Sequence, residues 1–422
     1  MSLPLPGRIL PLAPGTFRAL RHPDFRVLWI GLLVSLTGRW MQSVAQGWLV
    51  LRLSDSAFQL GLVGFLGFFP ALLLALPAGV AADRLPRRTT LLWTQSASMI
   101  LALALAGLTW LGWVRIWHVG ALAFATGVAG TLDIPVRQSL LQDLVGRDDL
   151  PNAIALNSLA FNLSRMVGPA IAGLMLAAAG EAAVFGITGL GYVALVVAIR
   201  ALRNRPSVPP AERTSWIGLI RGGIVHAARE PRMRILLVLV VVTSVFGASY
   251  SILLPIFARD VHGVGSRGLG WMMSATGLGA VGGALALAGR HGRIRAGRTV
   301  GTAMLVLGLS LVGFSLTRSY PLALTLLVLV GGSTIVQMAT SNTLLQLLAP
   351  AELRGRIISL YLLAFMGTAP FGALLAGWLA RRIGTPQAVA AGGVVCAATA
   401  LWFSSRIPAI RAAAAEAERR YL

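Results

Sequence analysis

Long apolar stretches separated by short polar segments recur along all 422 residues of the chain. Each stretch is roughly 20 residues long, the length that a helix needs to cross about 30 Å of hydrocarbon. Because lipid offers no hydrogen bonds to an open backbone, we expect these stretches to be α-helices. The pattern predicts twelve crossings, near residues 25–51, 58–82, 89–111, 117–141, 152–179, 184–202, 234–257, 268–289, 299–317, 321–346, 355–380 and 386–405.

The placement of the arginines gives these crossings an orientation. The net charge is +22, although charged residues make up 12% of the chain, against roughly 25% in soluble proteins. If the crossings alternate, 26 arginines fall on the side of both termini, 7 fall on the other side, and Arg39, Arg137 and Arg165 fall inside the membrane. The positive-inside rule then puts both termini in the cytoplasm. The charge therefore reports topology, and we expect no nucleic-acid partner.

The longest polar gap divides the chain into two sets of six helices. Pro206, Pro209 and Pro210 begin this gap, and Ser215 to Ala228 has the pattern of an amphipathic helix on the membrane surface. We expect an all-α polytopic membrane protein with 12 transmembrane helices in two pseudo-symmetric six-helix bundles. The predicted parts are an N-terminal arm (1–24), a first bundle (25–202), a linker (203–233), a second bundle (234–405) and a C-terminal tail (406–422).

The two bundles contain an internal repeat. Residues 140–173 resemble residues 344–377, at an offset of 204 positions. Identical residues include Leu140, Leu141, Gln142, Gly168 and Gly173, each with its partner 204 positions later. Chance similarity among apolar sequences is the alternative explanation. A repeat that keeps its orientation is typical of transporters whose two bundles rock around a site at mid-membrane.

A charged turn interrupts the apolar pattern between the second and third crossings. Gly79, Asp83, Arg84, Arg87 and Arg88 there have the spacing G-x-x-x-D-R-x-x-R-R. A glycine allows close helix approach, and an aspartate at the membrane edge can accept hydrogen bonds from arginines. This loop resembles a motif of the major facilitator superfamily, and the resemblance implies a cytoplasmic gate between the bundles. The alternative is a basic turn that only fixes orientation.

A second motif lies in the fifth crossing, in the segment SRMVGPAIAG at residues 164–173. Its Gly168, Pro169 and Gly173 resemble the G-P-x-x-G-G motif of antiporters in this superfamily, although alanine replaces the first of the paired glycines. A proline within a helix kinks it, and small neighbours let another helix pack closely. Longer stretches along nearly the whole chain resemble the bacterial drug:proton antiporter branch that includes the enterobactin exporter family. The resemblance implies export.

Polar residues inside the crossings are candidates for the substrate cavity, because hydrocarbon penalises them. One stripe in the first helix has the spacing 4, 3, 4 of a single helical face. The predicted cavity residues are Ser35, Arg39, Gln42 and Gln46 of this stripe, with Arg165, Tyr250, Gln337 and Tyr361. A structural network between helices is the alternative for the stripe. Two arginines with amides and aromatics suit an amphipathic solute, anionic or aromatic, and neutral lipophilic drugs are compatible as well.

Asp133 is the one acidic residue predicted within a crossing. It can pair with Arg137 one helical turn later, or with Arg165 on the next helix. A bridge that orients the helices is one interpretation, and a proton carrier is the other. A carrier would have to alternate between a position beside arginine and a position away from it, because a nearby cation disfavours protonation.

These observations predict a multi-pass protein of the bacterial inner membrane, a monomer that exports a small drug-like or siderophore-like solute with proton coupling. An importer or lipid-type carrier on the same fold is the alternative. The five histidines are scattered over loops and helix ends, and no nucleophile, metal cluster or phosphate-binding loop is evident. We therefore expect no enzyme activity, no cofactor and no metal.

Overall fold

The computed structural model describes residues 17–202, 230–289, 296–350 and 353–421. For residues 76, 80, 82, 83 and 407–421 it describes the backbone alone. The predicted amphipathic segment 215–228 lies outside the described residues.

Helices make up nearly all of the described chain, which contains no strand, and the predicted all-α class is confirmed. Elements η2 and η3 are π-helices, and η1 is a 3-10 helix. In chain order the elements are η1 (Arg18–Arg21), α1 (Pro23–Ser54), α2 (Ala57–Arg84), α3 (Arg87–Trp110), α4 (Ile116–Ala201), α6 (Pro231–Val242), η2 (Thr243–Gly247), α7 (Tyr250–Ile256), η3 (Phe257–Val261), α8 (Gly265–Ala288), α9 (Ala296–Leu316), α10 (Tyr320–Leu348), α11 (Arg354–Met366), α12 (Ala369–Ile383) and α13 (Thr385–Tyr421).

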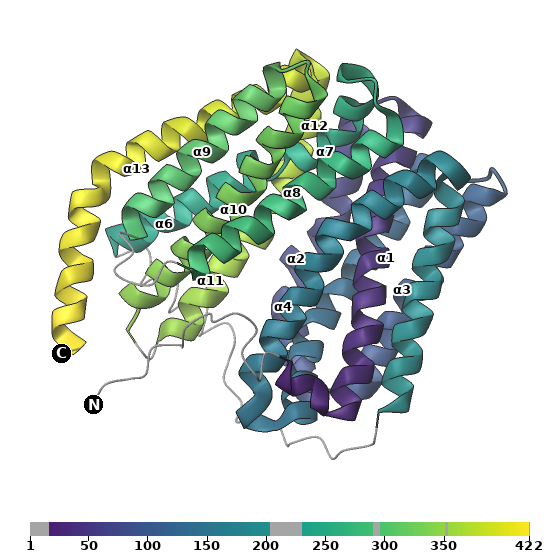
Figure 1. Ribbon diagram of the computed structural model, residues 1–422, viewed down its shortest axis with the longest axis horizontal. Coiled ribbons are helices and arrows are strands. Elements are labelled where there is room, and N and C mark those ends of the chain that lie inside the picture. The colour runs from purple at the N-terminus through teal and green to yellow at the C-terminus, as the bar shows by residue number, and fades with distance from the viewer. Residues whose placement is uncertain (1–16, 203–229, 290–295, 351–352, 422) are drawn as a thin grey trace.

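Nine helices within the described residues are long and apolar enough to cross a membrane. One of them is α4, whose 86 residues bend at Gly146 and Gly180, each with a φ of 74° that favours glycine. Helix α4 therefore folds back on itself (Figure 1). Helix α1 is not among the nine, although its 32 residues are long enough. The count of twelve crossings stays a prediction.

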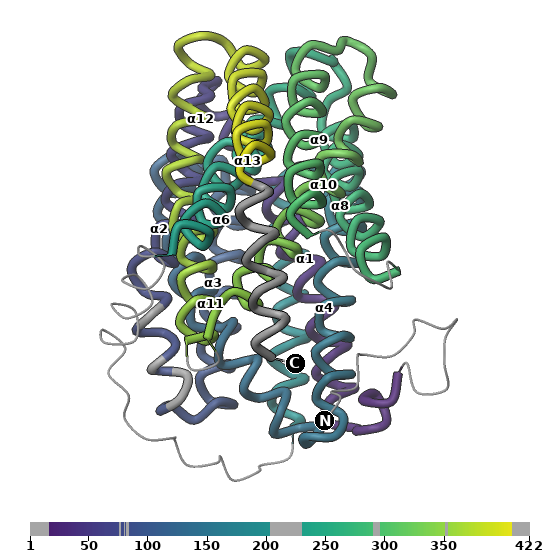
Figure 2. The backbone as a smooth tube through the Cα atoms, turned by 90° about the vertical axis from the view of Figure 1, so that its left-hand side faces the viewer, coloured from purple at the N-terminus to yellow at the C-terminus, as the bar shows by residue number. Residues whose placement is uncertain are grey.

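The molecule has two halves, α1–α4 and α6–α13 (Figures 1 and 2). We call the end of the molecule where α1 begins, at Pro23, the near face, and the end where α1 stops, at Ser54, the far face. The halves meet where α2 packs on α12 and α4 packs on α8. Toward the far face they share one apolar core, which includes Leu49 and Leu254. Toward the near face each half has a core of its own.

The packing within the halves follows the repeat seen in the sequence. A Cβ atom on Gly127 would overlap the carbonyl oxygen of Gly67, where α4 crosses α2. A Cβ atom on Gly331 would overlap the carbonyl oxygen of Thr276, where α10 crosses α8. Gly127 and Gly331 are 204 positions apart, which is the offset of the sequence repeat. Corresponding helices of the two halves therefore approach through corresponding glycines.

Two helices predicted as continuous are interrupted in the second half. The segment predicted over 234–257 consists of α6, η2, α7 and η3, and the segment over 355–380 breaks at residues 367–368, between α11 and α12. The two interruptions touch, because the Ser244 hydroxyl donates to the Phe365 carbonyl at 2.6 Å. At the C-terminus, α13 continues as a helix beyond residue 405 to Tyr421.

Candidate functional site

The far face is closed by two close crossings between the halves. A Cβ atom on Gly61 of α2 would lie 2.9 Å from Cα of Gly377 in α12. A Cβ atom on Gly270 of α8 would lie 2.9 Å from Cα of Gly173 in α4. Such distances leave no room for a side chain, so glycine is required at both crossings. Small residues let helix backbones touch in this way within a membrane.

The two crossings are copies of one contact. Gly173 and Gly377 are 204 positions apart, and Gly61 and Gly270 are 209 positions apart. Each crossing therefore pairs a helix of one half with the equivalent partner in the other half. In both crossings the distance from the added Cβ atom to the opposing glycine Cα is 2.9 Å. The far face is closed by a pseudo-two-fold symmetric contact.

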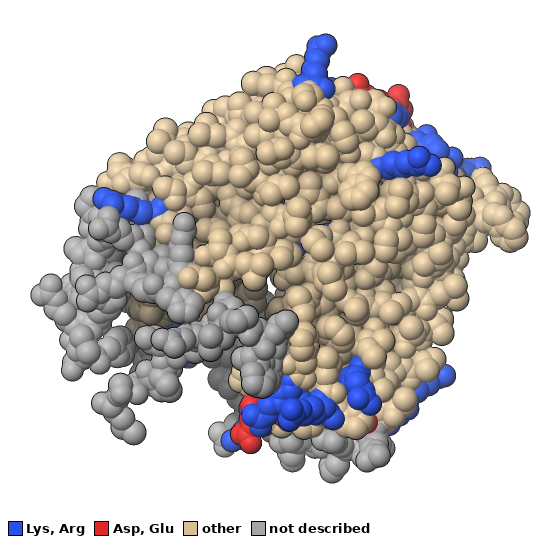
Figure 3. Space-filling model, in the orientation of Figure 1, with Lys and Arg blue, Asp and Glu red and all other residues tan. Residues whose placement is uncertain are grey.

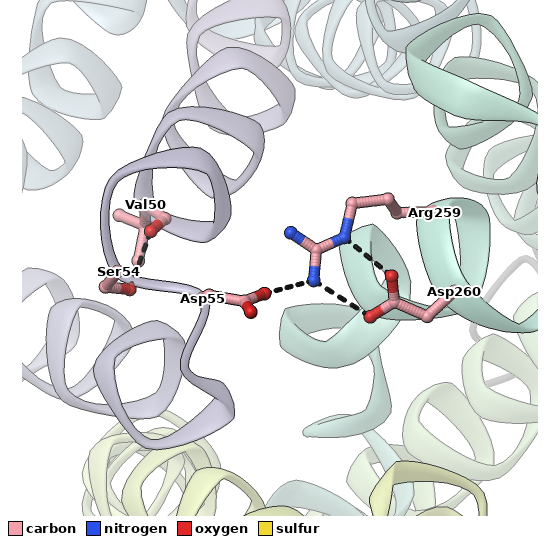
Figure 4. Close-up of polar contacts among 5 residues, drawn as sticks. All are labelled: Val50, Ser54, Asp55, Arg259 and Asp260. Atoms are coloured by element: carbon pink, nitrogen blue, oxygen red, sulfur yellow. Dashed lines mark hydrogen bonds and ion pairs between the residues drawn. The ribbon is translucent and has the colours of Figure 1, made fainter.

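An ion pair also joins the halves at the far face (Figure 4). Asp55, in a left-handed turn after α1, accepts a hydrogen bond from the Arg259 guanidinium of η3. Arg259 also donates to Asp260 at 2.6 Å. The side chains of Asp55 and Arg259 are 78% and 36% exposed, and exposed pairs contribute at most about 1 kcal/mol. The pair aligns the halves, and the glycine crossings and shared core hold them together.

Toward the near face the halves separate. The helices of the two halves diverge toward this face (Figure 1), and charged residues gather at the two ends of the molecule with an uncharged band between (Figure 3). The separate apolar cores toward this face agree with this divergence. The described molecule is therefore closed at the far face and open at the near face.

The charged turn between α2 and α3 lies at the near face, where its arginines bind the first half. Arg87 Nη1 donates to both carboxylate oxygens of Asp143, at 2.6 and 2.7 Å. Arg88 donates to the carbonyls of Ile199, at 3.1 Å, and Arg200, at 2.7 Å, at the end of α4. Cations near the last carbonyls of a helix are favourable. These two arginines tie the turn to α4.

The remaining residues of this motif make no described contact with the second half. A Cβ atom on Gly79 would meet nothing within 4 Å, so the close approach expected there is not made in this conformation. Arg84 is exposed, and the side chain of Asp83 lies outside the described residues. A gate formed by this turn between the halves stays a prediction.

Asp133 is at the centre of a polar network inside the first half. Its side chain is buried, and Gln95 Nε2 donates to Asp133 Oδ1 at 2.6 Å. Arg137 Nε lies 3.5 Å from Asp133 Oδ2, and Ser35 Oγ donates to Gln95 Oε1 at 3.5 Å. The network links α1, α3 and α4. Of the two predicted partners, Arg137 is the one paired with Asp133.

The predicted polar stripe of α1 has two environments. Ser35 and Gln42 are buried, whereas Arg39 and Gln46 are partly exposed. A Cβ atom on Gly130 of α4 would lie 2.5 Å from an Nη atom of Arg39, so this glycine makes room for the guanidinium. Ser35 belongs to the Asp133 network, and the lining of a cavity by the stripe stays a prediction.

Arg165 lies where α4 crosses α8, because a Cβ atom on Gly277 would be 2.9 Å from the Arg165 carbonyl oxygen. Its guanidinium carbon is 5.8 Å from the ring centre of Trp40 on α1, a cation–π contact. Trp40 also packs edge-on against Phe161, with ring centres 5.8 Å apart. A cation and two aromatic rings thus form one cluster on the first half.

Tyr250 of α7 brings the second half to this cluster. Helix α7 packs on α1, which carries Trp40, and on α8, and Tyr250 is close enough to Arg165 for the two side chains to interact electrostatically. The antiporter-like motif positions the other side, since a Cβ atom on Gly168 would be 2.8 Å from Cβ of Trp40. Pro169 is buried beside the crossing of α4 with α8. We name Arg165, Trp40, Phe161 and Tyr250 the central cluster.

The other predicted cavity residues of the second half are buried in neutral surroundings. Gln337 is fully buried, and its Nε2 donates to Ser341 Oγ at 3.3 Å. Gln337 Oε1 and Thr340 Oγ1 are buried with no hydrogen-bond partner among the described residues. Tyr361 donates its hydroxyl to the Met338 carbonyl at 3.2 Å. These polar atoms are available to water or to a solute if the half rearranges.

Sequence reasoning missed several of these residues. Gln95 is a single amide in an apolar helix, and this isolation was its one signal. Trp40 and Phe161 look like ordinary apolar positions, and Asp55 and Arg259 look like ordinary loop charges. Only the packing of distant helices reveals their partners.

Comparison with known proteins gives a consistent result. The family described as transmembrane secretion effector matches residues 14–422. The multidrug efflux pump Tap of Mycolicibacterium fortuitum is 29% identical over 86% of this chain and 90% of its own length. The enterobactin exporter EntS of Shigella flexneri is 26% identical over 87% and 88%. The staphyloferrin A transporter of Staphylococcus aureus is 27% identical over 58% and 62%.

Solved structures share the fold at low sequence identity. A bacterial homologue of the human lysosomal transporter Spinster, in an inward-facing and unoccupied conformation, has a TM-score of 0.70 at 16% identity, over 96% of this chain and 98% of its own. The nucleoside transporter NupG has a TM-score of 0.68 at 13% identity, over 92% and 98%.

Proposed function

Because this chain belongs to the transmembrane secretion effector family of the major facilitator superfamily, we propose that it is a proton-coupled exporter of a small drug-like or siderophore-like solute. Two relatives that span most of its length are named as an efflux pump and an exporter. The observation that carries the proposal is the symmetric glycine closure of the far face, opposite a near face toward which the halves diverge and have separate apolar cores. A carrier that exposes one side at a time requires this geometry.

We propose that the near face is cytoplasmic. Described arginines of the predicted cytoplasmic segments, such as Arg87, Arg88 and Arg200, lie at this end, and the positive-inside rule associates such residues with the cytoplasm. The conformation described here is then inward-facing, ready to take up a solute from the cytoplasm or the inner leaflet. The protein works as a monomer in the bacterial inner membrane.

Transport follows if the halves pivot about the central cluster. Opening the far face separates the crossings Gly61/Gly377 and Gly173/Gly270 and divides the shared core. Closing the near face brings the turn at Gly79–Arg88 toward the second half, as the gate motif of the superfamily implies. A solute at the central cluster would then face the opposite side of the membrane.

Asp133 is the proposed proton carrier. It is buried, and its partners Gln95 and Arg137 are on two different elements, so a small shift of α3 against α4 changes its surroundings. Its counterpart in the repeat, 204 positions later, is Gln337, which does not titrate. Coupling therefore depends on the first half. The alternative is a fixed bridge that only orients the helices.

The test is gradient-driven transport in vesicles that hold the purified protein. With an imposed pH gradient, we expect uphill movement of a fluorescent lipophilic dye or of a catechol-type acid, in the direction opposite to the protons. Asp133→Asn should abolish uphill movement and retain exchange of solute down its own gradient. Asp148→Asn is the matched control, because Asp148 is an exposed aspartate of the same helix.

Uphill transport by Asp133→Asn would refute the carrier assignment. Movement of solute in the same direction as the protons would favour the importer. Turnover of a compound by protein in detergent, where no second compartment exists, would indicate an enzyme instead.

A further inference from the structure

The charges at membrane depth do not balance. Among the described residues that lie more than three positions from either end of a predicted crossing, Arg39, Arg137 and Arg165 are cationic and Asp133 is anionic. Asp133 is already held by Gln95 and Arg137. A guanidinium in a medium of low dielectric constant is costly unless an anion lies close to it. The first half therefore has cationic groups at this depth in excess of its carboxylates.

Arg165 is the guanidinium best placed to meet a solute. No described carboxylate lies within ion-pair distance of it, and its described contact is with the face of Trp40. It is partly exposed, although it lies at mid-helix. Below it on the same helix, Phe161 is 43% exposed, one helical turn toward the near face. An exposed aromatic ring and a partly exposed arginine that lacks a described anion thus lie one turn apart on α4, with the ring on the side of the near face.

The second half faces this arginine with neutral groups. Tyr250 and Thr276 supply hydroxyls and no charge. The position equivalent to Arg165 in the repeat is Ala369, 204 residues later, so the second half offers no matching cation. A solute at the central cluster therefore meets one guanidinium, three aromatic rings and neutral hydroxyls.

We infer that the central cluster binds amphipathic aromatic acids, with the anionic group of the solute on Arg165 and its ring against Trp40 and Phe161. This inference rests on the proposed transport function and specifies its substrate class. A guanidinium forms strong, often bidentate hydrogen bonds with a carboxylate, and aromatic rings pack edge-on or offset against one another. A lipophilic cation would face repulsion from Arg165 without a described carboxylate to offset it.

The test compares three probes with the same ring and different charge, namely 1-naphthoate, 1-naphthamide and 1-naphthylmethylammonium. Binding to the purified full-length protein in lipid nanodiscs is measured by calorimetry, with no pH gradient. We expect naphthoate to bind at least about tenfold more tightly than the amide, which is the effect of one charge-assisted hydrogen bond. The ammonium probe should bind most weakly.

Arg165→Gln should reduce the ratio of naphthoate affinity to naphthamide affinity to about one, and should leave the affinity for the amide nearly unchanged. Arg165→Lys should keep part of the preference, because the charge remains. The matched control is Arg382→Gln, since Arg382 makes the same kind of contact with Trp378, at 5.9 Å, near the end of α12 at the far face. Its loss should leave the preference unchanged.

Three results would overturn the inference: tightest binding of the ammonium probe, a preference for the acid that survives Arg165→Gln, or no binding of naphthoate. The assay is independent of proton coupling. A protein that prefers the acid but moves nothing uphill would refute the proposed coupling and leave the substrate class standing. A protein that transports solute uphill but binds the ammonium probe most tightly would refute the substrate class and leave the proposed coupling standing.

Discussion

The two halves share one packing skeleton and differ in the chemistry placed on it. Gly173 and Gly377 make the same contact with the opposite half, at the same distance from a glycine Cα. Gly127 and Gly331 both press against a backbone carbonyl of the neighbouring helix. Positions where a backbone touches a backbone therefore correspond between the halves. Space, rather than charge, determines them.

The polar interiors of the halves do not correspond in this way. Asp133 and Arg137 form an ion pair one turn apart in the first half, and the same two positions of the second half, Gln337 and Ser341, form a neutral hydrogen bond. An uncharged copy keeps the geometry of the helix and loses the ability to titrate. The comparison shows that the repeat keeps the shape of the helices, while at these two positions the ion pair is present in the first half alone.

The position of Arg39 gives a second contrast. Thr37 of α1 packs near Gly168, and Val245 of η2 packs near Gly372, the residue equivalent to Gly168. Thr37 and Val245 are therefore equivalent positions, 208 residues apart. At the same offset, the residue equivalent to Arg39 is Gly247. A Cβ atom on Gly247 would approach Leu307, Cys396 and Thr243, with no charge nearby. In the first half this position is an arginine within a continuous α-helix, whereas in the second half it is a glycine at the end of the π-helix η2. Such π-helical turns are frequent at functional sites.

The largest expected effect tests the shared skeleton. Gly173→Val and Gly377→Val should each force the far face open and abolish transport, because a side chain would overlap the backbone of Ser266 or Ala57. We expect equal effects, since the two contacts are copies. Spin labels at positions 55 and 259, in a Cys396→Ser background, should report a longer distance across the far face. Gly186→Val is the control, since a Cβ atom there meets nothing within 4 Å. Opening by one variant alone would contradict the symmetry.

The next effect tests the difference in chemistry. Asp133→Ala should lower the free energy of unfolding by about 3–5 kcal/mol, because it leaves Arg137, whose side chain is 11% exposed, without its ion-pair partner. Gln337→Leu should change it by less than about 1 kcal/mol, because it removes one neutral hydrogen bond, to Ser341 at 3.3 Å, together with a buried carbonyl oxygen that has no partner among the described residues. Thermal unfolding in one detergent, followed by intrinsic fluorescence, compares the two variants. Equal losses of stability would mean that the ion pair of the first half contributes no more to folding than the neutral hydrogen bond of the second half.

A smaller effect concerns the far-face end of η3. His262 is surrounded by Phe257, Phe314 and Tyr320, with ring centres 6.1–6.5 Å away. Both of its ring nitrogens are buried without a hydrogen-bond partner among the described residues. Burial lowers the pKa of His262 below its usual 6.5. The folded protein therefore favours the neutral ring.

The sign of the pH dependence follows from this lowered pKa. The contribution of the neutral His262 ring to stability is fully present above pH 6.5, where the ring is neutral in both the folded and the unfolded chain. This contribution is lost as the pH falls below 6.5, because the unfolded chain then binds the proton more readily than the folded chain. The melting temperature of the wild type should drop between pH 7 and pH 5 by more than that of His262→Phe. The equivalent residue of the first half is Ser54, which hydrogen-bonds to Val50 at 2.7 Å (Figure 4). Ser54→Ala should not change the pH dependence.

The smallest effect concerns the ion pair Asp55–Arg259. Asp55→Asn should cost at most about 1 kcal/mol of far-face closure, since both groups are exposed, and the cost should shrink in high salt. Labels on Ser54 and His262 would detect a modest rise in the open population. A loss as large as that of Gly173→Val would show that the ion pair, and not the glycine crossings, holds the far face closed.

The sequence by itself determined the class of protein, its family and its repeat. Runs of about 20 apolar residues indicate helices that span a membrane. The two motifs and the longer similar segments indicated the superfamily, which the comparisons confirm. The offset of 204 was already visible in Leu-Leu-Gln and in the spacing of Gly168 and Gly173. These properties depend on composition, period and local spacing, which a linear chain displays directly.

The tertiary structure decided which polar groups meet. The 4, 3, 4 spacing of Ser35, Arg39, Gln42 and Gln46 places them on one helical face, but the neighbouring helices decide which of these residues are buried. The pairing of Asp133 with Gln95, and of Arg165 with Trp40, joins residues 38 and 125 positions apart. Such contacts depend on the rotation and depth of each helix in its bundle. Periodicity alone fixes neither, because several rotations can bury apolar surface comparably well.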